Sequence, residues 1–298
     1  MSAMRPLQSE SAAISGYAQI VTKLAREASI ELNVQDVDDL EASRALLPQG
    51  KRIYISHLPK QRWSETLIAC QRVRAAGFDP IPHIPVRLIE SESELDDILE
   101  RAVRVGVKEL LLIAGDYAHV AGPYSAVAEV LQPNKLTQHG FTRVSFAGHP
   151  EGHPKVPREQ IRRAEVEKAA LATSLETTFV TQFFFEASPF LEWAADSRTR
   201  GMKGARLIAG LAGPAGIATL LKFAKRCGVG PSIRALVTRP SAFSKLIGEH
   251  GPEEVMHSLA VAYAKDASVF TGLHFFCFGG YLRTCEWLDK VVAGEIEI

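Results

Sequence analysis

The sequence of 298 residues has no excess of charge of either sign, because 34 basic and 34 acidic residues give a formal net charge of +0. General electrostatics therefore gives the chain no affinity for nucleic acid or for an anionic membrane surface. The first ten residues lack the apolar core of a signal peptide, and no apolar run approaches the length of a membrane span. We expect a cytoplasmic protein with no nucleic-acid or membrane partner.

Cysteine is scarce and is not arranged in a metal-binding pattern. No CxxC pair occurs, and no cysteine has the spacing to histidine that zinc sites show, so we expect reduced thiols. The four cysteines are Cys70, Cys227, Cys277 and Cys285. His149 and His153 stand among Pro150, Gly152 and Pro154, which disfavours the helical i,i+4 geometry of a metal-ligand pair. We expect no metal.

Two glycine-rich nucleotide-binding motifs, GxGxxG and GxxxxGK[ST], do not follow any strand-like segment, which disfavours an open doubly wound sheet. Strand-like and amphipathic helix-like segments instead alternate along the whole chain. The eight expected strands are Ala28–Asn33, Arg52–His57, Pro80–Arg87, Glu109–Ala114, Arg143–Ala147, Thr178–Phe184, Arg206–Leu211 and Val269–Phe276. Eight strands alternating with helices predict a single (β/α)₈ barrel of the TIM type, in the α/β class.

The helix-like segments that separate the strands include Ser64–Ala76, Ser93–Val105, Arg158–Ser174 and Ile217–Cys227. Residues 1–27 are expected to form an N-terminal extension whose helix, Tyr17–Ala28, covers the bottom of the barrel. The stretch Gly213–Glu254 is longer than one strand-helix unit needs, so it predicts extra helices before the last strand. No linker rich in Pro, Gly or Ser divides the chain, which we interpret as one barrel domain over residues 1–298.

Polar residues stand near the C-terminal ends of the expected strands, which meet at one mouth of a parallel barrel, where active sites are built. They are Glu31, Ser56 and His57, His83, Gly115 and Asp116, His149 and His153, and Gln182. Gln182 interrupts an aromatic, β-branched run and could equally be a satisfied amide in a core strand. A lone Asp after Gly is commonly a turn or a helix cap, and a lone His on an apolar strand is commonly a core residue.

Two further features allow both a functional and an ordinary explanation. Arg87 and the helix Arg158–Lys168 could contact phosphate, or the helix could present a solvated charged face. The turn Gly213-Pro214-Ala215-Gly216 lets backbone approach a ligand closely, or it simply precedes a helix.

Four of these features, in order along the chain, resemble motifs of the methylenetetrahydrofolate reductase family. They are Ile81-Pro82-His83-Ile84, Ala114-Gly115-Asp116, the loop His149–Pro154, and Thr181-Gln182-Phe183-Phe184-Phe185, which is close to the family's TQFFFD strand. The resemblance implies a flavin-dependent barrel of one-carbon metabolism. Such an enzyme interconverts 5,10-methylene- and 5-methyltetrahydrofolate by hydride transfer, with FAD as cofactor, NAD(P)H as electron partner and a reduced folate as substrate.

The resemblance also implies roles for individual residues. Glu31 would be the general acid that helps to open or close the folate imidazolidine ring. Asp116 would lie by the flavin pyrimidine edge and influence its reduction potential, and Gln182 would hold the pterin against the flavin. The implied cofactor contacts are Ser56, His57, His83, Gly115, Asp116, His149, His153 and Lys168. We expect Gln182, Gly213 and Arg283 to contact the substrate, and the resemblance implies this role for Gln182.

The sequence departs from the family at several of these positions. Glu31 lacks the family's aromatic and proline neighbours, the second-strand segment Tyr54–Pro59 is different, and Ala114 stands in place of an arginine. The dipeptide Gly279-Gly280 replaces an Asn-Arg pair linked to folate binding. The folate tail would then be bound by Arg283 or by Arg206.

These departures leave two alternatives open. In one, hydride passes directly from the nicotinamide to the folate without a flavin. In the other, the barrel is a non-catalytic subunit that binds folate or flavin for a partner enzyme. The sequence does not decide the physiological direction, the choice between NADH and NADPH, or whether a homo-oligomer forms.

Overall fold

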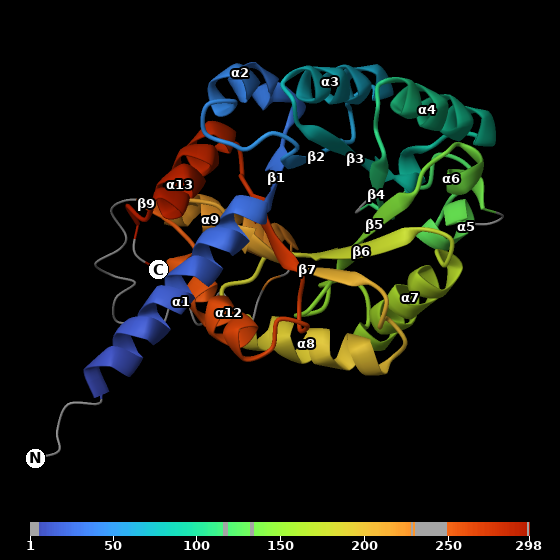
Figure 1. Ribbon diagram of the computed structural model, residues 1–298. Coiled ribbons are helices and arrows are strands. Elements are labelled where there is room, and N and C mark those ends of the chain that lie inside the picture. Colours follow the sequence, from blue (N-terminus) through green and yellow to red (C-terminus); the bar gives the residue numbers. More distant parts are fainter. Residues whose placement is uncertain (1–5, 116–118, 132–133, 228, 230–248, 297) are drawn as a thin grey trace, which may run out of the picture.

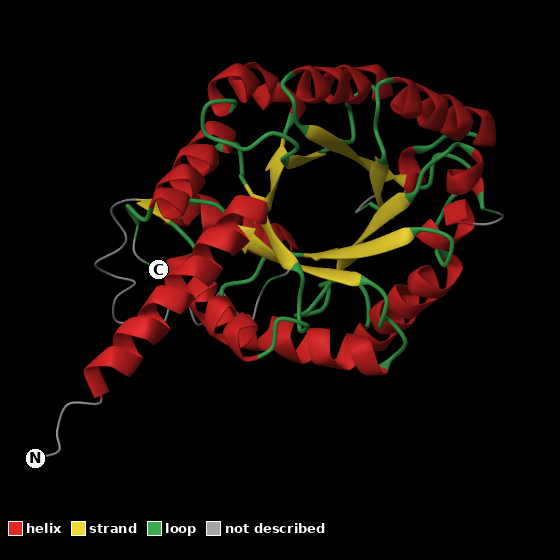
Figure 2. Ribbon diagram, in the orientation of Figure 1, coloured by secondary structure: helices red, strands yellow, loops and turns green. Residues whose placement is uncertain are grey.

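The computed structural model describes residues 6–115, 119–131, 134–227, 229, 249–296 and 298 (Figure 1). Eight parallel strands close into a barrel, and helices surround it (Figure 2). The strands are β1 (Ser29–Leu32), β2 (Arg52–Ile55), β3 (Asp79–Pro85), β4 (Glu109–Ile113), β5 (Arg143–Gly148), β6 (Glu176–Thr181), β7 (Arg206–Ala212) and β10 (Gly272–Phe276). They follow one another around the barrel in chain order, and β10 pairs back to β1. The predicted (β/α)₈ barrel is confirmed.

The described helices alternate with these strands. They are α1 (Pro6–Glu27), α2 (Leu40–Ser43), α3 (Trp63–Ala75), α4 (Glu92–Arg104), α5 (Val127–Leu131), α6 (Lys135–Gln138), α7 (Arg158–Leu171), α8 (Ala187–Thr199), α9 (Ile217–Cys227), α12 (Glu253–Lys265) and α13 (Tyr281–Ala293). Short 3₁₀ helices span Val34–Asp39 and Val86–Leu88, and the two-residue strands β8 (Ala215–Gly216) and β9 (Glu249–His250) pair antiparallel. Both α9 and α12 lie between β7 and β10, so the extra helices expected before the last strand are present.

The N-terminal helix α1 does not take the position expected for it. It packs along α12 and α13 at the flank of the barrel, and it leaves the barrel opening uncrossed (Figures 1 and 2). Val21 and Leu24 are buried on its inner face. The buried ammonium group of Lys51 donates hydrogen bonds to the carbonyls of Ala25 (3.2 Å) and Arg26 (2.9 Å). This contact fixes the C-terminal end of α1, so the helix supports the barrel from the side and does not cover its bottom.

Strand β6 ends three residues earlier than the sequence predicts, and this placement matters for the site. The backbone N–H of Gln182 still donates to the carbonyl of Gly148 (2.9 Å), but its side-chain Oε1 accepts a hydrogen bond from the N–H of Phe183 (3.1 Å). The side chain of Gln182 thus accepts from the N–H of Phe183, which a continuing strand would donate to its neighbour. Gln182 therefore lies directly beyond the end of the strand, at the mouth.

The interior of the barrel is filled with side chains. A central apolar layer consists of Tyr54, Ile81, Leu111, Val180 and Ile208. One polar chain crosses the barrel: Tyr54 hydrogen-bonds the hydroxyl of Ser145 (2.9 Å), which donates to Glu109 (2.5 Å). Because the barrel is packed and is not a pore, a ligand must bind at one of its ends, and the C-terminal mouth is the end that carries the loops.

Candidate active site at the mouth of the barrel

The parallel order of the strands places nearly all of the expected site residues at the same mouth. Glu31 lies on β1, Ser56 and His57 follow β2, His83 lies on β3, Gly115 follows β4, His149 and His153 follow β5, Gln182 follows β6, Gly213 follows β7 and Arg283 lies in the first turns of α13 after β10. Asp116 lies outside the described residues. Arg206 begins β7 at the opposite end of the barrel, so the expectation that it binds a folate tail at the mouth is wrong.

Three of these side chains, on neighbouring strands, form one group. The backbone N–H of Ser56 donates to the carbonyl of Leu32 (3.0 Å), and the side chain of Ser56 acts to lower the pKa of the Glu31 carboxyl group. The Nε2 atom of His83 lies 4.0 Å from Oε2 of Glu31. Within the part of the chain that the structure describes, this buried Nε2 has no hydrogen-bond partner. Glu31, Ser56 and His83 thus form an acid site with an unused ring nitrogen beside it.

Burial shifts the pKa of the acid and of the imidazole in opposite directions. It raises the pKa of Glu31 to about 7, although the hydrogen bond from Ser56 acts against the rise. It lowers the pKa of His83 to about 3, and the neighbouring His57 lowers this pKa further. At neutral pH, His83 is therefore uncharged and Glu31 is poised between its acid and its carboxylate. A carboxyl group with such a pKa can both give and take up a proton near neutral pH.

His57 is directed into the protein. Its ring stacks on Trp63, with centroids 3.8 Å apart, and its Nδ1 lies 2.7 Å from the hydroxyl oxygen of Thr66. Burial lowers the pKa of His57 to about 4. No sequence pattern singles out Trp63, because a lone Trp at the start of an amphipathic helix is an ordinary core residue. These two contacts hold the His57 ring against α3.

The loop after β5 is held by a buried acid that the sequence analysis missed. The two carboxylate oxygens of Glu165 accept hydrogen bonds from the N–H of His149 (3.1 Å), the indole of Trp193 (3.1 Å) and the guanidinium of Arg162 (3.2 Å). The rings of His149 and His153 meet edge to face, with centroids 5.7 Å apart. An acidic residue in a helix rich in charged residues is usually exposed. No sequence signal therefore distinguishes the buried Glu165 from the other acidic residues of α7.

Lys168 does not join the group around Glu31. Its Nζ lies 3.5 Å from the carbonyl oxygen of Ala147 and within 5.5 Å and 5.7 Å of the ring centroids of Phe146 and Phe179. These rings belong to the core between the strands and the surrounding helices. Burial lowers the pKa of Lys168 to about 8. Its amine thus contacts the outer layer of the barrel.

The side of the mouth around Gln182 is aromatic. Five phenylalanines from β10, α9 and the ends of β6 and β10 contact one another, and we refer to them as the aromatic cluster: Phe183, Phe185, Phe223, Phe276 and Phe278. Phe278 has φ +49°, in the left-handed region that bulky residues rarely adopt. Its ring centroid lies 5.0 Å from that of Phe183 and 4.5 Å from that of Phe223. Backbone strain of this kind gathers at functional sites.

The two remaining expected substrate contacts lie beside the aromatic cluster. The N–H of Gly213 donates to the carbonyl of Phe276 (2.9 Å), which joins the end of β7 to the end of β10. The guanidinium of Arg283 lies 3.5 Å from the carbonyl oxygen of Pro214. Both residues therefore shape the loop that borders the aromatic side of the mouth.

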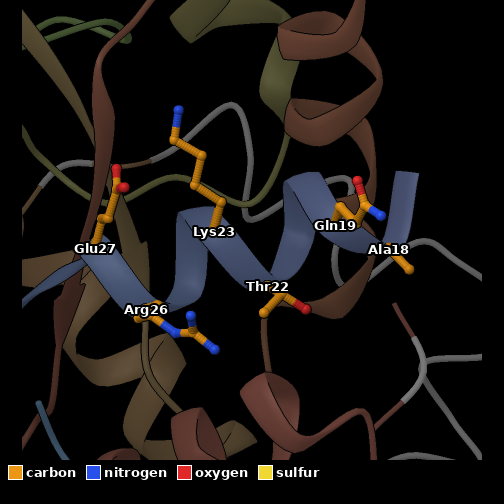
Figure 3. Close-up of a pocket in the computed structure, with 6 residues that line it drawn as sticks. All are labelled: Ala18, Gln19, Thr22, Lys23, Arg26 and Glu27. Carbon is orange, nitrogen blue, oxygen red and sulfur yellow. The ribbon is translucent and has the colours of Figure 1, made fainter. Parts of the chain in front are cut away.

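A concave surface of about 520 Å³ lies elsewhere, along α1. It is lined by Ala18, Gln19, Thr22, Lys23, Arg26 and Glu27. Figure 3 shows Lys23 and Glu27 on one side of this helix and Arg26 on the other, so their polar groups do not converge on a ligand. Among the described residues, no group of three or more His, Cys, Asp or Glu side chains is arranged to hold a metal ion. No described helix is both long enough and apolar enough to cross a membrane.

The residues expected to hold FAD fit that cofactor only in part. His83 presents a buried ring nitrogen to the mouth, and Gly115 follows β4 with φ +86°, a conformation that leaves its backbone open to close approach. Nδ1 of His57 and the amine of Lys168 are instead engaged with the protein. The described residues therefore leave only part of the expected FAD contacts available to a ligand.

Comparisons with known proteins agree with the motifs. The family model described as methylenetetrahydrofolate reductase matches residues 52–239, which is more than half of the chain. The chain belongs to the methylenetetrahydrofolate reductase family. Methylenetetrahydrofolate reductase 2 of Saccharomyces cerevisiae is 25% identical over 118 residues, which cover 37% of this chain and 20% of the yeast protein. The match thus spans about one fifth of the length of that relative.

A solved structure shows the same fold. It is an uncharacterised protein from Clostridium thermocellum that binds two copies of 5-methyl-5,6,7,8-tetrahydrofolic acid, with a TM-score of 0.60 and 13% sequence identity. The likeness covers 93% of this chain and 99% of that protein. At this level of identity, the comparison supports the barrel fold alone.

Proposed function

We propose that this member of the methylenetetrahydrofolate reductase family is an oxidoreductase that interconverts 5,10-methylenetetrahydrofolate and 5-methyltetrahydrofolate. The observation that carries the proposal is Glu31, a largely buried carboxyl group at the barrel mouth with 18% of its side chain exposed, whose pKa is raised to about 7. The reaction needs one well-placed acid and precise positioning of its reactants, and it needs no covalent nucleophile. The family to which the chain belongs supplies the substrate class.

The chemistry assigns Glu31 a definite step. When the imidazolidine ring of methylene-folate opens, the bond between the one-carbon unit and N10 breaks, and N10 takes up a proton from the Glu31 carboxyl group. The electron pair on N5 then forms an iminium with the one-carbon unit, and a hydride added to that carbon produces the methyl group. In the oxidative direction, Glu31 takes the proton back. His83 supports this role because, being uncharged, it does not hold Glu31 in the ionised form.

We propose FAD as the cofactor and NAD(P)H as its electron partner. When bound, the flavin supplies or accepts the hydride at its N5. His83, Gly115, His149 and His153 are the described residues that would hold it, with Ser56 at the same edge of the mouth. Asp116, the residue expected at the flavin pyrimidine edge, lies outside the described residues.

The opposite side of the mouth is proposed to hold the folate. The side chain of Gln182 can bond the edge of a heterocycle without bringing charge, and the aromatic cluster offers apolar ring surfaces beside it. Gly213 and Arg283 border the same region. Arg283 remains the candidate for the acidic tail of the folate, because Arg206 lies at the other end of the barrel.

A second candidate function is the same reaction without a flavin, with the hydride passing directly from the nicotinamide to the folate. The positions of His57 and Lys168, both engaged with the protein, favour this alternative. A purely folate-binding subunit is disfavoured, because burying an acid costs free energy that binding alone does not require.

An absorption spectrum of the purified protein, recorded with and without added FAD, separates these functions. Bound flavin whose absorption bleaches on addition of NADH or 5-methyltetrahydrofolate supports the flavin-dependent enzyme and identifies the electron donor. If the protein binds no flavin but oxidises NADH in the presence of methylene-folate, the result supports direct hydride transfer from the nicotinamide. No flavin binding and no turnover contradict the proposed activity.

A further inference from the structure

We propose that Glu165 is a positioning residue for Gln182: its carboxylate fixes the orientation of the Gly148–His149 peptide group, and that peptide group holds the backbone of Gln182 at the mouth. The inference deepens the proposed function and rests on it, because the proposed function assigns Gln182 to the folate. Glu165 lies on α7, in the layer of helices around the barrel, so it acts only through this peptide group.

The Gly148–His149 peptide group is hydrogen-bonded on both sides. Its carbonyl oxygen, from Gly148, accepts from the N–H of Gln182 (2.9 Å). Its N–H, from His149, donates to Oε1 of Glu165 (3.1 Å). The C=O and the N–H of a trans peptide lie in one plane and point in opposite directions, so a partner that fixes one of them also fixes the other. A single rigid group therefore joins the carboxylate of Glu165 to the backbone of Gln182.

The glycine at the end of β5 does not fix this peptide group by its own conformational preference. Gly148 has no Cβ, so its backbone can adopt conformations that other residues avoid. A Cβ at this position would lie 2.8 Å from Cζ2 of Trp193, so the indole packs directly against the end of the strand. The Nε1–H of the same indole donates to Oε2 of Glu165 (3.1 Å). Trp193 thus holds the carboxylate that in turn holds the peptide group.

The carboxylate of Glu165 is buried, with 1% of its side chain exposed, and its charge is matched by two arginines. Oε2 accepts from Nη1 of Arg162 (3.2 Å), and Nη2 of Arg200 lies 3.8 Å from it. A buried carboxylate is costly unless its charge is paired and its oxygens are hydrogen-bonded. The arginines and the indole meet Oε2, whereas Oε1 accepts from the N–H of His149. A hydrogen bond to a charged acceptor is stronger than one to a neutral acceptor, so this N–H is held firmly.

The orientation of the Gly148–His149 peptide group matters because Gln182 lies directly beyond the end of β6. The side-chain Oε1 of Gln182 is turned back onto the N–H of Phe183 (3.1 Å), which couples the side chain to the backbone at this point. If the peptide group rotates, the N–H of Gln182 loses its acceptor and the side-chain amide shifts. A shift of about 1 Å in a group that positions a substrate can lower the rate about 100-fold. The placement of the amide at the mouth therefore depends on a carboxylate in the surrounding helices.

The test is hydrogen exchange at the backbone amide of Gln182, measured by NMR, which needs no turnover. Glu165→Gln keeps the size of the side chain but removes its charge and one of its two acceptor oxygens. We expect the Gln182 amide to exchange about tenfold faster in this variant. The amide of Ser56 makes the same kind of strand-end bond, to the carbonyl of Leu32 (3.0 Å), and should keep its wild-type rate. Glu167→Gln, at an exposed position on the same helix, is the matched control and should change neither rate.

A second variant serves if Glu165→Gln does not fold. Glu165→Asp keeps the charge opposite Arg162 but shortens the side chain by one methylene group, so the carboxylate should no longer reach both the N–H of His149 and its partners in the helices. Faster exchange at Gln182 in either folded variant, with an unchanged rate at Ser56, supports the inference. An unchanged rate at Gln182 overturns it. An equal increase at both amides also overturns it, because the variant would then have lost only global stability.

Steady-state kinetics test the consequence for the folate. Glu165→Gln should lower kcat/KM for the folate by about 10- to 100-fold in the wild-type background, but by less than about threefold in Gln182→Ala, where no side-chain amide is left to displace. Equal losses in the two backgrounds would overturn a role that acts through Gln182. A wild-type protein that shows the expected exchange but converts no folate overturns the proposed function and, with it, the role in folate positioning. The link from Glu165 to the Gln182 backbone is then still supported by the exchange measurement alone.

Discussion

His83 Nε2 lies 4.0 Å from Glu31 Oε2, yet the two side chains do not form an ion pair at neutral pH. Burial raises the pKa of Glu31 to about 7 and lowers that of His83 to about 3, so the protonated acid and the neutral imidazole coexist. An ion pair would shift both values the other way, because each charge would stabilise its partner. At neutral pH the site therefore keeps a substantial fraction of the acid protonated, where folate chemistry needs it.

Replacing Glu31 by Gln keeps the shape of the side chain but removes its transferable proton. We expect kcat for methylene-folate reduction to fall by about 10²- to 10⁴-fold, the usual contribution of a general acid. A bound flavin should still be reduced by its donor, because that half-reaction does not use Glu31. Glu27→Gln, at an exposed position on α1, is the control and should retain wild-type turnover. Turnover of Glu31→Gln within tenfold of the wild type would remove Glu31 from the mechanism.

The same substitution should also stabilise the protein at alkaline pH. The folded-state pKa of Glu31, about 7, lies above its ordinary value, so the neutral acid favours the folded state at low pH and this contribution is lost as pH rises through 7. Glu31→Gln does not titrate. Its free energy of unfolding should exceed that of the wild type by an amount that grows between about pH 4.5 and 7 and reaches up to about 3 kcal/mol at pH 8. Urea denaturation at a series of pH values measures the difference; a difference independent of pH would show that Glu31 ionises freely in the folded state.

Acidification should act on the fold through the buried histidines. Burial lowers the pKa of His83 to about 3 and that of His57 to about 4, so the unfolded chain takes up protons below pH 6.5 that the folded chain refuses. Each histidine should then reduce the free energy of unfolding by about 1.4 kcal/mol per pH unit below pH 6.5. In His83→Gln, the loss of unfolding free energy per pH unit should be smaller than in the wild type by the contribution of one histidine. His119→Gln, at an exposed position, should leave this slope unchanged. Equal slopes in the wild type and in His83→Gln would contradict the neutral state of His83.

The barrel itself could be predicted from the sequence, and the reason is physical. Apolar strands and amphipathic helices that alternate eight times have few ways to bury their faces other than a closed parallel barrel. The position of α1 could not be predicted in the same way. Val21 and Leu24 show that the helix has a buried face, but the sequence does not show that α12 and α13 cover it.

The candidate site was predictable in its residue types and less so in their orientations. Strand ends identify Glu31, His83 and Gln182 as residues of the mouth, but no pattern shows which way a polar side chain turns. In α7, Ile161, Glu165 and Lys168 are spaced at i, i+4 and i+7, so they share one face of the helix. That face is turned to the barrel, which buries Glu165 and directs Lys168 onto Ala147. The left-handed backbone of Phe278 depends on contacts among three elements and leaves no local signal.

Gly210 on β7 provides a test of how tightly the Gln182 side of the mouth is held. A Cβ atom at this position would collide with the carbonyl oxygen of Thr181 and crowd the ring of Phe276. Gly210→Ala should therefore displace Gln182, reduce the free energy of unfolding by about 1–3 kcal/mol and raise KM for the folate. Gly204→Ala, where the added atom meets nothing within 4 Å, is the control. Thermal denaturation and steady-state kinetics measure both effects; wild-type stability and KM in Gly210→Ala would show that β6 is free to move.

The most direct test of the account is to incubate the purified protein with methylene-folate and NADH deuterated at the transferred position, with and without FAD, and to analyse the folate by mass spectrometry. The account predicts 5-methyltetrahydrofolate as the product, and its formation should be lost in Glu31→Gln. Deuterium washed out into water would indicate passage through flavin N5, whose hydrogen exchanges with solvent, and deuterium retained in the methyl group would indicate direct transfer. The absence of any methyl-folate with and without FAD, together with no oxidation of added 5-methyltetrahydrofolate, would contradict the central claim.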